Sequence, residues 1–144
     1  MREIPVSRIT DAVERLCIEA NTHLPDDVKR AIEACHRCHL RDEGGLGPVL
    51  STGPADAPLM IVGEGPGRVE DDYGGPLIGP SGQLLDKALA SVGITRDHVY
   101  VTNIVKCRPR GNRTPTIEEG HFCGSIWLAE EIRQVKPKVI IGLG

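Results

Sequence analysis

The sequence predicts an α/β fold in which a parallel sheet is flanked by helices. Three short aliphatic runs, over 59–62, 99–105 and 139–141, have the β-branched composition of buried strands. Two stretches whose apolar residues recur at helical spacing separate these runs. The order strand, helix, strand, helix, strand is typical of right-handed parallel crossovers. A chain of 144 residues has the length of one such domain.

The composition restricts the partners and the location of the protein. With 40% hydrophobic but only 3% aromatic residues, the core must be mainly aliphatic. The net charge of −3 argues against nucleic-acid affinity spread over the whole surface, so any DNA binding requires a local basic cluster. There is no signal peptide and no apolar run of transmembrane length, which predicts a cytoplasmic protein with no membrane partner. We also expect it to act as a monomer.

Residues 1–34 are expected to form a helical appendage to a domain over 35–144. Apolar residues recur at helical spacing over 9–20, and Pro25 with the two aspartates after it opens a second helix. Two segments here resemble the start of the α subunit of iron–sulphur fumarate/tartrate hydratases. They are MREIPVSRITDAVERLCIEAN and LPDDVKRAIEA. This resemblance stops before Cys35, and none of that family's catalytic segments follows.

Two further helices are expected between the predicted strands. Ser81 is expected to cap the first, which Gly93 ends, and an acidic stretch over 70–72 before it is expected to be a solvated turn. Thr116 and Glu119 have the spacing of a capping box at the start of the second helix. Its periodicity predicts an inward face made of Phe122, Ile126, Ala129 and Ile132.

Four of the five cysteines have the pattern of a metal site. Cys35 and Cys38 form a CxxC pair, Cys107 follows the second strand, and Cys123 lies in the first turns of the next helix. Four thiolates suit tetrahedral zinc or a [4Fe–4S] cluster, and the spacing alone does not choose between them. Cys17 lies within the N-terminal helical pattern and is expected to be a small core residue.

Polar side chains follow the first two predicted strands at their carboxyl ends, where parallel sheets bind ligands. Asn103 ends the second strand, and its amide can donate and accept hydrogen bonds at once. Glu64 leaves the first strand at the same edge, either as a site residue or as a solvated loop carboxylate. The glycine-rich turn over 63–67 lets the backbone approach a ligand closely. It lacks the Walker lysine and the dinucleotide glycine spacing, so no nucleotide cofactor is expected.

A cationic loop follows the second strand and can contact phosphates. Its four basic residues are Lys106, Arg108, Arg110 and Arg113. Ser81, at a predicted helix start, offers a further phosphate contact through free backbone N–H groups.

From Cys35 to Gly144 the sequence resembles the iron–sulphur uracil-DNA glycosylases of the family 4 type. The resemblance rests on GEGPGRVEDDYGGPLIGPSGQLL, on VYVTNIVKCRPRGNRTPTIEE and on the cysteine after them. It implies a parallel sheet flanked by helices, with three of four core strands present. It also implies hydrolytic excision of a flipped uracil from DNA and a structural [4Fe–4S] cluster. The cluster ligands would be Cys35, Cys38, Cys107 and Cys123.

The resemblance also implies roles for single residues. Asn103 would read the amide edge of uracil, and Glu64 would lie near the sugar and the hydrolytic water, so these two are the expected catalytic residues. Substrate contacts are expected from Gly65, Pro66, Gly67 and Leu77, and DNA contacts from Ser81, Lys106, Arg108, Arg110 and Arg113. Leu77 stands where the family usually has an aromatic residue that stacks on uracil.

The family's later His-Pro motif and fourth strand lie beyond the position that corresponds to Gly144. We therefore expect a domain shortened at its C-terminal end, with an activity that is weak or lost. One alternative is a non-catalytic iron–sulphur protein that binds DNA. The N-terminal resemblance alone supports the other alternative, a hydratase-related subunit.

Overall fold

A computed structural model describes residues 24–144 of the chain. The helix expected over 9–20 and Cys17 therefore lie outside the described residues.

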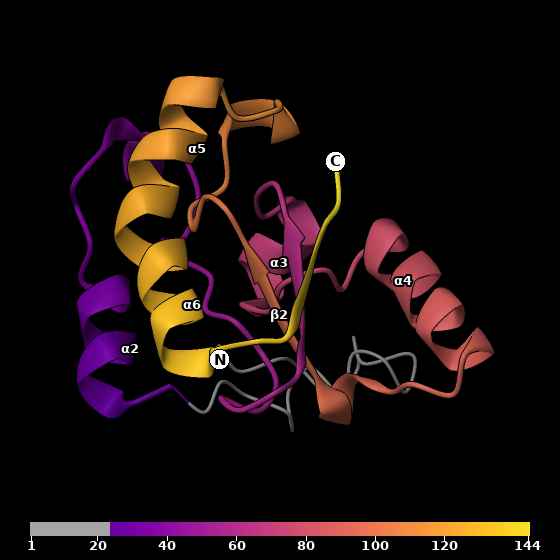
Figure 1. Cartoon of the computed structure of the whole chain (residues 1–144). Coiled ribbons are helices and arrows are strands. Elements are labelled where there is room, and N and C mark those ends of the chain that lie inside the picture. Colours follow the sequence, from indigo (N-terminus) through magenta and orange to yellow (C-terminus); the bar gives the residue numbers. More distant parts are fainter. Residues whose placement is uncertain (1–23) are drawn as a thin grey trace.

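Three parallel strands form the sheet at the centre of the molecule (Figure 1). They are β1 (Leu59–Gly63), β2 (Val99–Asn103) and β3 (Val139–Gly142), in the order β2-β1-β3. This arrangement confirms the predicted fold class. β2 ends at Asn103, two residues before the predicted end of the strand, because the chain turns there into the loop that leads to α5.

Helices cover both faces of the sheet. In Figure 1, α2, α5 and α6 lie on one side of the strands, and α4 lies on the other. The α-helices are α2 (Asp26–Glu33), α3 (Arg68–Tyr73), α4 (Pro80–Ser91), α5 (Ile117–Cys123) and α6 (Ala129–Val135). A π-helical turn, η5 (Gly124–Leu128), joins α5 to α6. The 3₁₀ turns are η2 (His39–Asp42), η3 (Arg96–His98) and η4 (Arg110–Asn112).

The alternation of side chains along the strands divides the core between these two layers. On one face, Met60 and Tyr100 pack with Val28 and Ile32 of α2. On the other face, Ile61, Val99 and Val101 pack with Leu89 of α4. Helix α2 therefore contributes to the main core.

Two local expectations between β1 and α4 are wrong. The acidic stretch 70–72 is not a solvated turn but part of α3, where Asp71 is buried and accepts the amide of Leu46 at 2.9 Å. Helix α4 begins at Pro80 with Gly79 as its N-cap, so Ser81 lies in the first turn rather than at the cap. Proline is favoured at the first helical position because its missing N–H would have no partner there.

The capping box at the start of α5 is confirmed, since Thr116 Oγ1 accepts the amide of Glu119. The inward face predicted for this helix is right only in part. Ile132 packs against the main core and Ile126 is half-buried, but Phe122 is 45% exposed and Ala129 is exposed as well. The fully buried positions are Gly120, Cys123, Glu131 and Val135, so a glycine, a cysteine and a charged residue hide part of the buried face from the apolar pattern.

Strand β3 forms one edge of the sheet, and its apolar side chains are exposed. Val139, Ile140 and Ile141 are 54%, 47% and 43% exposed. Across residues 24–144, no helix has the length and apolar character needed to span a membrane.

Candidate functional site

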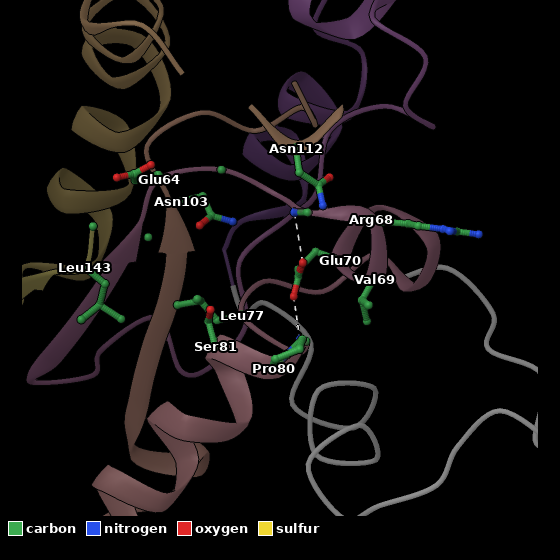
Figure 2. A pocket seen from close by; sticks show the side chains of 15 residues that line it. Glu64, Arg68, Val69, Glu70, Leu77, Pro80, Ser81, Asn103, Asn112 and Leu143 are labelled. Atoms are coloured by element: carbon green, nitrogen blue, oxygen red, sulfur yellow. Dashed lines mark hydrogen bonds between the residues drawn. The ribbon is translucent and has the colours of Figure 1, made fainter. Parts of the chain in front are cut away.

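A cleft of about 400 Å³ opens at the carboxyl ends of β1 and β2. Its walls are the glycine-rich turn after β1, the start of α3, the start of α4 and the end of β2. The close-up in Figure 2 shows side chains from these segments converging on it. Ligands of open parallel sheets bind at this edge, so the cleft has the position of a binding site.

Asn103 forms part of the cleft wall from a buried position at the end of β2. It is 3% exposed and pairs in register with Gly63 of β1. A Cβ atom at Gly63 would overlap the Asn103 Oδ1 atom, so the amide can occupy this place only beside a glycine. The sequence alone did not indicate that Gly63 has this role.

Glu64, the residue after β1, lines the same cleft with an exposed carboxylate. Figure 2 shows Glu64 beside Asn103, with Leu77 and Ser81 approaching from the loop before α4 and from its first turn. The structure thus brings together the amide and the carboxylate that the sequence placed at one edge.

Other predicted substrate residues lie at the cleft or next to it. Gly65, Gly67 and Leu77 line the cleft, and Pro66 lines an adjoining pocket that also includes Arg113. Sequence reasoning missed Arg68, Glu70 and Asn112, which line the cleft as well. The one available signal was the position of Glu70 three residues after Gly67, where its carboxylate accepts the Gly67 amide at the start of α3.

Lys106 is not a surface cation. It is 3% exposed, and its ammonium group donates to Thr102 Oγ1 at 2.8 Å, to the carbonyl of Asn103 at 2.7 Å and to the buried carboxylate of Glu131. An ammonium group has three protons to donate, and all three are used inside the protein. This burial contradicts the expected role of Lys106 as a DNA contact.

Arg113 is also committed to partners within the protein. Its guanidinium group donates to both oxygens of Glu119 at 2.7 Å and to Glu43 at 2.8 Å. The hydrogen bonds from Arg113 lower the pKa of Glu119 far below its ordinary value. Of the other predicted DNA contacts, Arg110 and Ser81 are exposed, and Arg108 is partly exposed and donates to Asn112 at 2.7 Å.

The four predicted ligand cysteines line one small cavity. Its wall contains Cys35, Cys38, Cys107 and Cys123, together with Leu40, Pro48 and Trp127. The indole N–H of Trp127 donates to the sulphur of Cys35 at 3.4 Å. Four soft thiol donors around one largely apolar cavity are a suitable ligand set for an iron–sulphur cluster. Among the described residues, no three of the four sulphur atoms lie within 4.8 Å of one another, a wider spacing than the thiolates of one tetrahedral zinc ion have.

The electrostatics of Cys107 reflect this grouping. Burial, together with the nearby Cys123 and Cys38, raises the pKa of the Cys107 thiol to about 12. Burial also raises the pKa of Cys123. Thiols of this kind ionise readily only beside a cation, because a bound metal reverses the local preference for the neutral form.

The fold and the cleft define the class of protein: a parallel α/β domain with a ligand site at the carboxyl edge of its sheet and a separate cavity of cysteines. A family model described as the uracil DNA glycosylase superfamily matches residues 50–144. The chain belongs to this family.

Several curated relatives are similar over most of this chain. The type-4 uracil-DNA glycosylase of Archaeoglobus fulgidus is 43% identical over 119 residues, which is 83% of this chain and 59% of the relative. The type-4 uracil-DNA glycosylase of Thermotoga maritima is 42% identical over 121 residues, or 84% and 62%. A type-5 uracil-DNA glycosylase of Pyrobaculum aerophilum is 37% identical, over 67% of this chain and 49% of the relative.

The chain therefore spans about three fifths of the length of its type-4 relatives, 59% and 62% in these two cases. The expected resemblance to this family is confirmed, whereas the N-terminal resemblance to a hydratase finds no support in these matches.

Proposed function

We propose that this protein is a uracil-DNA glycosylase that hydrolyses the bond between a flipped uracil and its deoxyribose. The observation that carries the proposal is that the Asn103 amide and the Glu64 carboxylate line the same cleft. The names of its type-4 relatives support the same activity.

Asn103 provides a means of distinguishing uracil from cytosine. The amide oxygen accepts from the N3–H of uracil, while the amide N–H donates to the uracil O4. Cytosine carries an acceptor at N3 and a donor at C4, so the same amide orientation meets two mismatched groups. Leu77 packs against the face of the base, without the π-face that an aromatic residue adds to stacking.

The reaction follows from these positions. The base leaves the duplex at a cost of a few kcal/mol. As the bond from the sugar C1′ to the uracil N1 breaks, its electron pair stays on uracil, and the Asn103 N–H stabilises the charge that develops on O4. Glu64 lies where a carboxylate can orient the attacking water and stabilise the cationic sugar. The water adds its hydroxyl to C1′, and uracil leaves with a proton.

Exposed and partly exposed polar groups near the cleft, three of them arginines, supply the contacts to the DNA backbone. Arg108 and Arg110 lie in the loop after β2, Ser81 lies in the first turn of α4, and Arg68 lines the cleft itself. Contacts of this kind position the strand and make its binding sensitive to salt.

Cys35, Cys38, Cys107 and Cys123 would hold a [4Fe–4S] cluster that has a structural role. When bound, the cluster would cross-link the loop before η2, the loop after β2 and the end of α5. The reaction above contains no redox step and needs none.

The cluster is tested by the visible spectrum and the metal content of protein purified without oxygen. We expect a brown protein whose broad absorption is lost in Cys107→Ala and retained in the matched control Cys17→Ala. A colourless protein that contains zinc would contradict the assignment.

The activity is tested by measuring release of free uracil from single-stranded DNA that contains one uracil. We expect slow release by the unchanged protein, a loss of about 100-fold or more in Asn103→Ala, and no change in Gln134→Ala, an amide on α6 away from the cleft. Equal release by all three proteins would contradict the role of Asn103. DNA retention without release of uracil would favour a protein that only binds DNA.

A further inference from the structure

We propose that Arg96 and Glu70 are positioning residues that hold the loop over 76–79, which we call the Leu77 loop, in the shape needed for base recognition. The part of this inference that concerns the base rests on the proposed function. The part that concerns the loop stands on hydrogen bonds alone.

The Leu77 loop adopts a conformation that its sequence does not favour. Leu77 has a φ of 49°, in the left-handed region that is unfavourable for residues with a side chain. Such a residue persists only when surrounding contacts hold it, and residues of this kind concentrate at ligand sites.

Arg96 donates hydrogen bonds to the backbone carbonyl groups of the Leu77 loop. This arginine, in η3 just before β2, is 4% exposed. Its guanidinium group donates to the carbonyl of Pro76 at 3.3 Å and to the carbonyl of Leu77. The Arg96 Nε–H donates to Asp86 of α4 at 2.6 Å, which fixes the orientation of the guanidinium plane. The N–H donors of the Arg96 guanidinium group are thus shared between the loop and the helix that follows it.

Glu70 accepts hydrogen bonds from the backbone amide groups of the Leu77 loop. From α3, its Oε2 accepts the amides of Ile78 at 3.0 Å and Gly79 at 2.6 Å. Its Oε1 accepts the amide of Gly67 at 3.0 Å, so one carboxylate joins the glycine-rich turn after β1 to the Leu77 loop (Figure 2). Hydrogen bonds from backbone amides to a carboxylate are among the stronger ones in proteins.

The glycines around the loop allow this close approach. A Cβ atom at Gly82 would collide with the carbonyl of Leu77, and a Cβ atom at Gly79 would lie 3.1 Å from Glu70 Oε2. The loop is therefore held between a buried cation and a carboxylate with little free space.

The consequence is a defined position for the Leu77 side chain. Its Cδ1 lies 3.5 Å from the place that a Cβ atom at Gly63 would occupy, on the side where Asn103 also lies. Leu77 lines the cleft, but Arg96 does not. Arg96 can therefore influence a bound base only through the loop, which makes it the sharper residue for a test.

The test compares the unchanged protein with Arg96→Met, Leu77→Ala and the double variant, and Arg96→Lys is included as the conservative change. Arg133→Met is the matched control, because Arg133 forms an exposed ion pair with Glu130 on α6. The first readout is backbone hydrogen exchange at Ile78 and Gly79. The second is the ratio of affinities for a single-stranded oligonucleotide with one uracil and for the same strand with thymine.

In Arg96→Met we expect exchange at Ile78 and Gly79 to speed up by about tenfold, while the amides of β1 keep their rates. Arg96→Met should lower the preference for uracil by about tenfold when Leu77 is present. The same substitution should change this preference by less than about twofold when it is added to Leu77→Ala. Arg96→Lys should restore part of both effects, and Arg133→Met should show neither.

An equal loss of preference in both Leu77 backgrounds would overturn the proposal, since Arg96 would then act through the general stability of the fold. Unchanged exchange at Ile78 and Gly79 would overturn it as well. If Arg96→Met does not fold, Glu70→Gln replaces it, because one amide oxygen cannot accept from both loops, and the same outcomes apply. A lack of uracil preference in the unchanged protein would contradict the proposed function and leave the exchange measurement as the test of the loop.

Discussion

At the scale of single residues, the position of Asn103 depends on a neighbour that has no side chain. Gly63 lies opposite Asn103 in the sheet, and the amide oxygen fills the space that a Cβ atom would take. A methyl group here must move the amide, the strand or both. Overpacking of this kind costs about 1–3 kcal/mol.

We therefore expect Gly63→Ala to weaken binding of a uracil-containing oligonucleotide by about tenfold, and to lower the midpoint of thermal unfolding by a few degrees. Gly142→Ala is the matched control, because it lies in the same sheet and a Cβ atom there meets nothing within 4 Å. Equal effects of the two substitutions would show that the close contact with Asn103 is unimportant.

At the scale of secondary-structure elements, one buried ion pair joins α6 to β2. Glu131 of α6 accepts from the ammonium group of Lys106 and from the hydroxyl of Tyr100, the latter at 2.6 Å. Both charged residues are almost fully buried. Removal of one partner leaves an unpaired charge in the interior, which typically costs about 3–5 kcal/mol.

We expect Lys106→Met and Glu131→Leu each to lower the free energy of unfolding by an amount in that range, about 3–5 kcal/mol, measured by urea denaturation. The double variant should lose much less than the sum of the two, because neither charge is then left alone. Additive losses would mean that the two side chains do not stabilise each other.

A second ion-pair group ties the loop after β2 to α5 and to the segment after η2. The hydrogen bonds from Arg113 lower the pKa of Glu119, and those from the Arg110 amide and Arg113 lower the pKa of Glu43. A carboxyl whose pKa is lower in the folded state than in the unfolded state stabilises the fold fully above its unfolded pKa. That stabilisation is lost as the pH falls toward the folded value.

Because the ordinary pKa of both carboxyl groups is 4.5, the loss should begin just above that value and continue as the solution becomes more acidic. We expect the free energy of unfolding of the unchanged protein to fall more steeply below about pH 5 than that of Arg113→Met. His39, which also contacts Glu119, is present in both proteins. Parallel pH profiles would contradict this account.

At the scale of the whole molecule, the features that follow from local sequence could be predicted. Aliphatic runs specify the strands, and the capping box at Thr116 specifies the start of α5. The carboxyl ends of parallel strands meet at one edge, so the adjacency of Glu64 and Asn103 also follows from topology.

The features that depend on contacts between distant segments could not be predicted. Arg96 and Glu70 reach the Leu77 loop from different elements, and nothing in their own neighbourhoods indicates this. The sequence indicates a surface cation at Lys106, because its partner, Glu131, lies 25 residues away along the chain. The burial of Glu131 also explains part of the error in the predicted helix face, because a buried carboxylate interrupts the apolar pattern on α6.

The account depends most on the claim that the Asn103 amide reads the hydrogen-bonding edge of a base in the cleft. The most direct test is Asn103→Asp, which keeps the shape of the side chain and replaces the amide donor with an acceptor. The measurement is release of free base from single-stranded DNA that carries either uracil or cytosine at one position. We predict that the variant loses most of its release of uracil and gains measurable release of cytosine relative to the unchanged protein. An unchanged preference for uracil would contradict the assignment of Asn103.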